Sequence, residues 1–138
     1  MNAIERFELS SDIYIDVQAS YNLLVRRENG RLNLNLVSAA QPTTPLVQKT
    51  LSNKEEESLT DALVNVQIDE WESSYEPEGF VVLDGFTWKL SLKTDDGNIE
   101  TGGTNSFPVG LRDLCRWLYD LCGVHLWDNT NDGPGLTD

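Results

Sequence analysis

The pair Asn29-Gly30 restricts the fold of this chain more than any other feature, because it separates two stretches that both have the pattern of a strand. Leu32, Leu34 and Leu36 alternate with polar residues, which is the two-residue period of a strand with one buried face. The stretch 21–27 precedes the pair, and Asn-Gly accepts the positive backbone angles of a tight turn. These residues therefore predict a hairpin within an antiparallel sheet.

Similar patterns predict further strands before and after this hairpin. One strand is expected over 13–17, where apolar and polar residues alternate, and another over 46–51, after a polar connection that contains prolines. A second hairpin is expected over 86–101, with its turn at Asp95-Asp96-Gly97. The apolar run 80–83 is also typical of a strand. The sheet should therefore be an antiparallel meander joined to a second hairpin.

Two stretches have the apolar period of an amphipathic helix. Ser52 and Glu55 form a capping-box pattern that predicts a helix over 54–67. Pro108 suits the first turn of a second helix, which Gly123 can end. The apolar stripe of this second helix consists of Leu111, Leu114, Cys115, Leu118, Leu121 and Cys122. We therefore expect an α+β fold, with an antiparallel sheet of about six or seven strands and two helices packed on one face.

The length of 138 residues fits one α+β domain over 1–127, followed by a flexible tail over 128–138 that has no apolar period. No stretch contains the long apolar run of a membrane span, and the first residues contain no apolar signal-peptide core. Cys115 and Cys122 are two helical turns apart, roughly 10 Å, which is too far for a disulfide. These features predict a cytoplasmic protein with reduced cysteines and no membrane partner.

The chain is strongly acidic, with a net charge of −13. Most of this charge lies in one stretch of ten carboxylates without a single Lys, Arg or His. These are Glu55, Glu56, Glu57, Asp61, Asp69, Glu70, Glu72, Glu76, Glu78 and Asp84. Such a charge repels nucleic acids and anionic lipids and favours a basic protein partner.

The acidic stretch divides into two parts. Residues 55–57 fall in the first turn of a predicted helix, where the helix dipole favours negative charge, so a structural role accounts for them. The part over 69–84 lies beyond that helix, and it is either a solvated face or a binding surface. It contains Trp71 and Tyr75, which either pack into the core or act as aromatic anchors for a partner. The predicted partner-binding residues are Asp69, Glu70, Trp71, Glu72, Tyr75, Glu76, Glu78 and Asp84.

No group of residues has the signature of a catalytic, metal or cofactor site. His125 is the only histidine, and Cys122 beside it lacks a cysteine-protease motif. Together with Cys115 and Asp128, these two residues do not have the spacing of a zinc site. The stretch 102–104, Gly-Gly-Thr, lacks the ending of a phosphate-binding loop and is interpreted as a turn after the second hairpin. We therefore expect no catalytic residue, no metal and no cofactor.

Three motifs together resemble a broad group of small bacterial proteins. They are Trp71-x3-Tyr75, Asp84-Gly85-x2-Trp88 and a Gly-x-Asn-x-aromatic-Pro pattern over 103–108. Some proteins of this group resemble immunity proteins encoded beside polymorphic or contact-dependent toxins. The resemblance covers about residues 59–122, and it implies a protein that binds and neutralises a cognate toxin and is not an enzyme. It transfers no catalytic or toxin-binding residue.

Two other functions fit the same acidic residues. A nucleic-acid mimic would place its carboxylates along an extended ridge and would inhibit a DNA- or RNA-binding protein. A small hydrolase would use two carboxylates with different pKa values, drawn from Asp69, Glu70, Glu72 and Asp84. The immunity protein, with an acidic face that covers a basic surface of its toxin, is our leading hypothesis.

Overall fold

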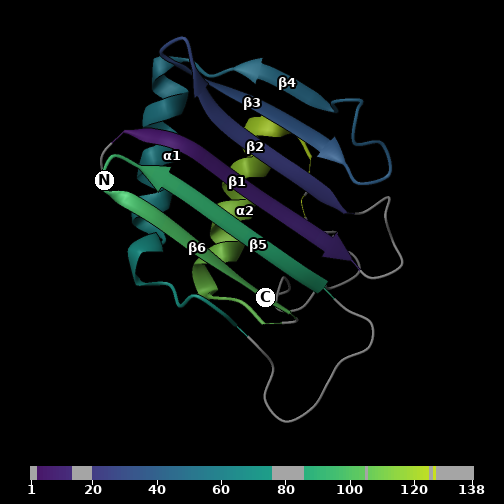
Figure 1. Cartoon of the computed structure of the whole chain (residues 1–138), viewed down its shortest axis with the longest axis vertical. Helices are drawn as coiled ribbons and strands as arrows, with labels where there is room; N and C mark the ends of the chain where they lie inside the picture. The colour runs from purple at the N-terminus through teal and green to yellow at the C-terminus, as the bar shows by residue number, and fades with distance from the viewer. Residues whose placement is uncertain (1–2, 14–19, 76–85, 105, 125, 127–138) are drawn as a thin grey trace.

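The computed structural model describes residues 3–13, 20–75, 86–104, 106–124 and 126, which form a six-stranded antiparallel sheet and two α-helices (Figure 1). The strands are β1 (Ile4–Ile13), β2 (Tyr21–Glu28), β3 (Arg31–Ser38), β4 (Val47–Thr50), β5 (Phe86–Thr94) and β6 (Gly97–Thr104). The helices are α1 (Asn53–Asn65), the short 3-10 helix η2 (Ile68–Glu70) and α2 (Val109–Cys122). The predicted α+β fold is therefore confirmed.

The strand order in the sheet is β4-β3-β2-β1-β5-β6. The first four strands are neighbours in chain order and form the predicted meander, while β5 pairs with the free side of β1. The second hairpin, β5 and β6, thereby lies on the opposite side of β1 from the first hairpin, β2 and β3. This order places β4 and β6 at the two edges of the sheet.

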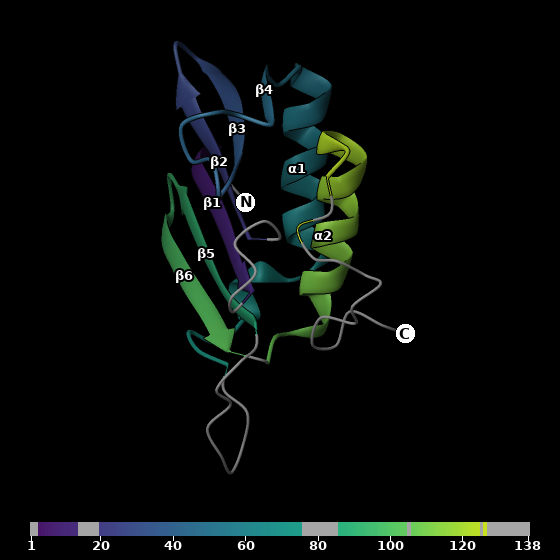
Figure 2. The ribbon, with the colours of Figure 1, turned by 90° about the vertical axis from the view of Figure 1, so that its right-hand side faces the viewer.

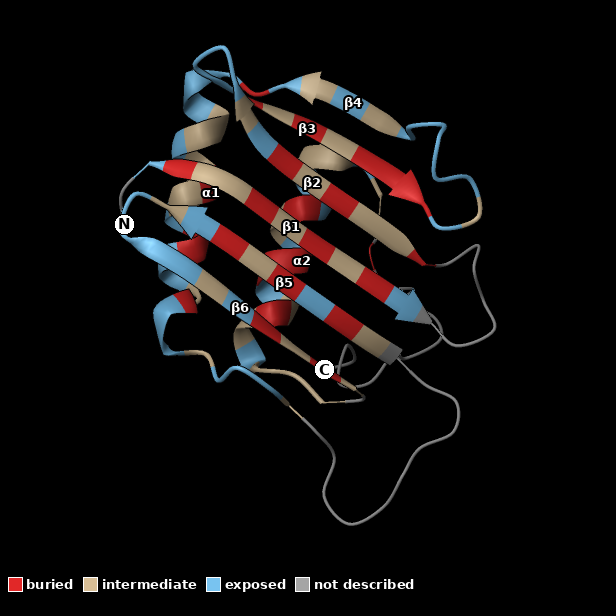
Figure 3. Cartoon of the chain, in the orientation of Figure 1, coloured by how far each residue is buried: buried red, intermediate tan, exposed pale blue. Residues whose placement is uncertain are grey.

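Both helices lie on the same side of the sheet, as Figure 2 shows. Buried and more exposed residues alternate along the central strands (Figure 3). The buried residues of the two helices belong to the same hydrophobic cluster as the buried residues of the sheet. The core joins sheet residues such as Phe7, Leu9, Leu23, Val25, Leu34, Leu90 and Leu92 to helix residues such as Leu59, Leu63, Leu111, Leu114 and Leu118. Burial of these apolar side chains is the main force that holds the two layers together.

The two predicted hairpin turns are confirmed. Asn29 and Gly30 have φ angles of 54° and 80°, the left-handed geometry that a two-residue turn between antiparallel strands requires. In the second hairpin, Thr94 pairs with Gly97, so Asp95-Asp96 forms the two-residue connection. Turn chemistry is local, and this explains why the sequence alone located both connections.

The first strand differs from the prediction. We expected a strand over 13–17, whereas β1 ends at the start of that range, and residues 14–19 lie outside the described part of the chain. The pairing register of β1 shifts between Ile4 and Arg6. This irregularity places the buried residues Ile4 and Phe7 three positions apart and breaks the two-residue period. An alternation of apolar and polar residues therefore does not reveal the first half of β1 in the sequence.

The prediction of a turn over 102–104 is wrong, because these residues end the edge strand β6. Tyr75 lies beside them: its amide donates to the Gly102 carbonyl at 2.8 Å, and its carbonyl accepts from the Thr104 amide at 3.1 Å. A Cβ on Gly103 would lie closer than 3.0 Å to the carbonyl oxygens of Tyr75 and Ser106. The glycine is therefore required by a close backbone approach and not by a turn.

Both helices follow their predicted signals. The Ser52 side chain accepts from the Glu55 amide, and the Glu55 side chain accepts from the Ser52 amide, so the capping box is present. Helix α2 ends at Cys122 and is followed by the C-cap Gly123, whose φ of 75° is left-handed. Neither described helix has a stretch that is long and apolar enough to cross a membrane.

Candidate partner-binding surface

The first two acids of the acidic stretch, Glu55 and Glu56, form ion pairs with basic residues of the sheet. The Glu55 carboxylate accepts a hydrogen bond from Lys49 Nζ at 2.6 Å, and Lys49 belongs to the edge strand β4. This bond, followed by the bond from the Ser52 backbone, lowers the pKa of Glu55 below its ordinary value of 4.5. Glu55 therefore both caps helix α1 and ties its first turn to the sheet.

Glu56 makes a second connection between α1 and the sheet. One of its carboxylate oxygens lies 3.3 Å from Arg27 Nη2, and the other lies 3.9 Å from Arg31 Nε. The backbone amide of Leu32 also donates to this carboxylate at 3.4 Å. The structural role that the sequence predicted for Glu55 and Glu56 is therefore confirmed, with ion pairs that the sequence did not predict.

The acids that follow α1 have a different environment. Asp69, Glu70 and Glu72 are exposed, and their side chains form no ion pair with any residue that the structure describes. They lie in or just after η2, which has no basic residue in its last turn. The other three predicted binding acids, Glu76, Glu78 and Asp84, lie outside the described residues.

The two aromatic residues among these acids pack against the core. Trp71 Nε1 donates to the Val66 carbonyl at 2.9 Å, and its ring meets Trp88 edge-on with centroids 6.1 Å apart. The Tyr75 ring lies 5.9 Å from Trp88, and its hydroxyl accepts from the Glu72 amide at 2.9 Å. Both side chains remain half-buried, so only part of each is free to contact a partner.

The backbone that carries these acids is fixed to the sheet edge. Thr101 Oγ1 donates to the Glu72 carbonyl, and the backbone of Tyr75 bonds to β6 on both sides of Gly103. Trp88 lies beneath both aromatic rings and is almost fully buried. The acidic residues are therefore presented from a segment that has defined contacts at several points, which lowers the entropy that a partner would have to remove on binding.

The structure adds to this surface one acid, Asp96, that the sequence predicts only as part of a turn. Asp95 and Asp96 are exposed at the β5–β6 turn, and Asp96 and Asp69 line the same recess of about 260 Å³. The turn and η2 are far apart in the sequence, and their proximity depends on how η2 returns to the sheet edge. No local sequence signal reveals this proximity.

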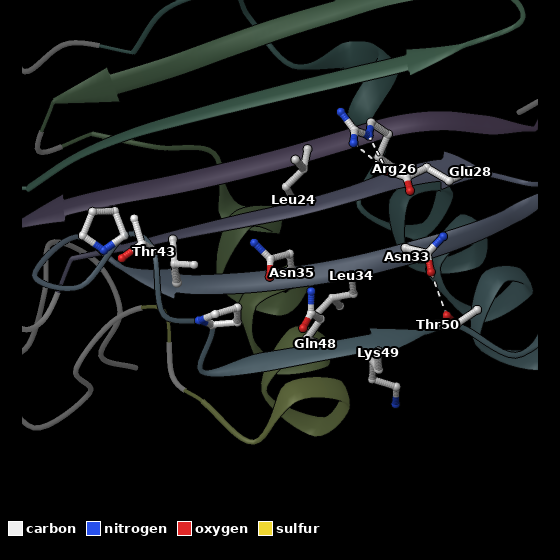
Figure 4. Close-up of a pocket in the computed structure, with 13 residues that line it drawn as sticks. Leu24, Arg26, Glu28, Asn33, Leu34, Asn35, Thr43, Gln48, Lys49 and Thr50 are labelled. Atoms are coloured by element: carbon white, nitrogen blue, oxygen red, sulfur yellow. Dashed lines mark hydrogen bonds and ion pairs between the residues drawn. The ribbon is translucent and has the colours of Figure 1, made fainter.

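A larger recess of about 760 Å³ lies on the sheet face that is not covered by the helices (Figure 4). Two of its three charged residues, Arg26 and Glu28, pair with each other, and Thr50 Oγ1 donates to Asn33 Oδ1 at 2.7 Å. Lys49 points away from this recess. The remaining lining includes Leu24, Asn35, Val37, Pro42, Pro45 and Gln48. Its chemistry is therefore neutral and does not match a strongly charged partner.

Two features of the described residues concern reactive cysteines and metal binding. Burial raises the pKa of the Cys122 thiol to about 11 and that of the Cys115 thiol well above its ordinary value. Both thiols are free, as predicted, and both stay protonated at neutral pH. Within the described ranges, no cluster of three or more His, Cys, Asp or Glu side chains could hold a metal ion. His125 lies outside these ranges.

No family model matches the chain, and no curated protein matches it. The class that the fold defines is an α+β protein with a six-stranded antiparallel sheet and two helices on one face. A function for this fold has to be argued from its surface.

Proposed function

We propose that this chain is a non-catalytic, cytoplasmic immunity protein that binds and neutralises a basic bacterial toxin domain. Its binding surface is the acidic segment, defined here as Asp69, Glu70 and Glu72 with Trp71 and Tyr75. The predicted acids Glu76, Glu78 and Asp84 follow it in the sequence and belong to the same proposal. The partner is a basic protein because a chain with a net charge of −13 repels other anions.

One observation carries the proposal: Glu55 and Glu56 at the start of α1 differ in charge pairing from the acids of the acidic segment. Glu55 and Glu56 have basic partners on the sheet, whereas the acids of the acidic segment pair with no described residue. Replacing an exposed carboxylate that has no ion pair changes the stability of a protein little. The stability of the fold therefore does not explain why these acids are grouped. A basic surface on a second protein would neutralise them.

The acidic segment also has the mechanical properties that fast and specific binding needs. Its backbone is bonded to β6, and Trp71 and Tyr75 present part of their rings beside the acids. Exposed charges increase the association rate, and aromatic surface supplies contact area at a small entropic cost. The complex should therefore form quickly at low salt and more slowly as the salt concentration rises.

The proposal is tested by expressing the chain with the toxin domain encoded beside it. The variant that changes Glu72, Glu76, Glu78 and Asp84 to Ser should lose complex formation and the rescue of growth. The matched control changes four exposed helix acids, Glu57, Asp61, Asp113 and Asp120, to Ser. If the first variant keeps its fold and still binds and rescues, the acidic segment is not the binding surface.

A further inference from the structure

The recess of about 760 Å³ on the uncovered sheet face is lined by polar side chains in a regular arrangement (Figure 4). Leu24, Asn35 and Gln48 are direct partners across β2, β3 and β4, so they form one row. Asn33 and Thr50 are partners in the next row along β3 and β4. Neighbouring strands lie about 4.8 Å apart, and residues two positions apart on a strand lie about 6.8 Å apart. The recess therefore presents amide and hydroxyl groups at short, repeated spacings.

Asn35, in the middle strand of this group, has a hydrogen-bond acceptor without a donor. Its Oδ1 is buried, and no described residue donates to it. Such an oxygen costs free energy until a donor reaches it. The residue as a whole is only half-buried and lines the recess, and the last torsion of an Asn side chain is soft. A modest rotation of the amide therefore turns this oxygen toward a donor that enters the recess.

Apolar surface lies beside the polar groups. Leu24 is half-buried on β2, at one end of the row that contains Asn35. Pro42 and Pro45 are exposed on the connection between β3 and β4, and both line the recess. The recess therefore combines apolar patches with groups that donate and accept hydrogen bonds.

The charged residues of the lining have partners within the protein. Arg26 pairs with Glu28, and Lys49 pairs with Glu55 of α1 and points away from the recess. An anion would also be repelled by the net charge of −13. A purely apolar ligand would cover the amides and leave them without hydrogen bonds. The chemistry of the recess therefore favours an uncharged ligand with many hydroxyl groups.

We propose that this recess binds a neutral saccharide, a function that goes beyond the proposed immunity function and does not depend on it. Each sugar hydroxyl both donates and accepts, which matches the amides of Asn35 and Gln48, and one of them supplies the missing donor to Asn35 Oδ1. The C–H groups of the ring pack on Leu24 and the prolines. The volume of about 760 Å³ lies within the range of small-molecule sites, about 300–1,000 Å³.

The proposal is tested by titrating the full chain, labelled with ¹⁵N, with four neutral sugars. These are the methyl glycosides of glucose, galactose and mannose, and N-acetylglucosamine. At least one should shift the amide signals of Leu24, Asn35, Thr43 and Thr50. Two probes should leave these signals unchanged: tetrahydropyran-2-methanol, which keeps the ring and lacks the ring hydroxyls, and glucuronate, which adds a negative charge.

Matched amide-to-leucine variants separate the recess from the rest of the sheet face. Asn35→Leu should weaken binding of the active sugar about tenfold, and Gln48→Leu, at an exposed position, about threefold. Asn98→Leu, at an exposed position of β6 on the opposite edge of the sheet, should leave binding unchanged. Without sugar, Asn35→Leu should be at least as resistant to heat as the parent chain, because it removes a buried acceptor without a donor.

Three results would overturn the saccharide proposal. None of the four sugars shifts the recess signals, tetrahydropyran-2-methanol shifts them as strongly as the sugars do, or Asn98→Leu weakens binding as much as Asn35→Leu. Unchanged amide signals of Leu114 and Leu118, in helix α2, show that each variant is folded.

Discussion

The first turn of helix α1 and the segment after it contain similar numbers of acids in very different settings. Glu55 and Glu56 contact Lys49, Arg27 and the Leu32 amide, and they connect α1 to three strands. The acids of the acidic segment are exposed and form no ion pair with a described residue, although the segment is bonded to β6 through the backbone of Glu72 and Tyr75. Charge density along the sequence is therefore a poor guide to function, and the placement of basic side chains after folding is a better one.

Of the changes considered, replacement of Trp88 by Ala should lower stability most, because Trp88 packs against the two aromatic rings of the acidic segment. The side chain is 1% exposed, contacts Trp71 and Tyr75, and donates from Nε1 to the Ser106 carbonyl. We expect a loss of about 3–5 kcal/mol in the free energy of unfolding. Urea denaturation followed by circular dichroism measures it. A loss below about 1 kcal/mol would show that the two rings do not depend on Trp88.

Replacement of Gly103 by Ala should loosen the acidic segment more selectively. The added Cβ would collide with the carbonyl oxygens of Tyr75 and Ser106, so we expect a loss of about 1–3 kcal/mol. Hydrogen exchange of the Tyr75 amide, which donates to Gly102, should become faster than that of the central strands. Glu100→Ala on the same strand is the control, with an expected change within about 0.5 kcal/mol. Unaltered exchange at Tyr75 would contradict the close approach.

The pair Glu56→Gln and Glu70→Gln compares the two regions directly. The first change removes a carboxylate that accepts from Arg27 and Leu32, and it should cost about 1–2 kcal/mol. The second change removes an exposed acid without an ion pair among the described residues, and it should alter stability by less than about 0.5 kcal/mol. Thermal and urea denaturation of both variants measure this difference. Equal losses would remove the distinction between structural and available acids.

The smallest expected effect is the contribution of the Glu55 carboxylate to the free energy of unfolding, and this contribution depends on pH. Lys49 lowers the pKa of Glu55 in the folded state, so the unfolded chain binds this proton more readily. The stabilisation is therefore complete above pH 4.5, the ordinary pKa, and is lost as the pH falls through the lower folded value. Glu55→Gln should cost less than about 1 kcal/mol at pH 7. A cost that stays constant down to pH 3 would contradict this ion pair.

Local signals predicted most of the fold, and long-range contacts account for what they missed. Asn29-Gly30, the capping box and the apolar stripe of α2 each act over a few residues, so the sequence located both hairpins and both helices. The irregular register at the start of β1 broke the expected alternation. The sequence wrongly predicts a turn at the Gly-Gly pair, because these glycines accommodate the approach of Tyr75, which comes from a distant part of the chain.

The candidate site shows the same limit. The sequence predicted a split within the acidic stretch, and the pairing of Glu55 and Glu56 confirms its structural half. The sequence left open whether Trp71 and Tyr75 belong to the core, and the structure packs both against Trp88. The recess shared by Asp69 and Asp96 was not predictable, because it exists only where η2 meets the second hairpin.

The most direct test of the account is the association rate of the chain with its toxin domain, measured by stopped flow over a range of salt concentrations. The variant with Asp69→Asn, Glu70→Gln and Glu72→Gln should associate about tenfold more slowly at low salt and lose much of the salt dependence, with its stability nearly unchanged. The control with Glu57→Gln, Asp61→Asn and Asp113→Asn should keep both. An unchanged rate in the first variant, or an equal loss in the control, would contradict the claim that the acidic segment is the binding surface.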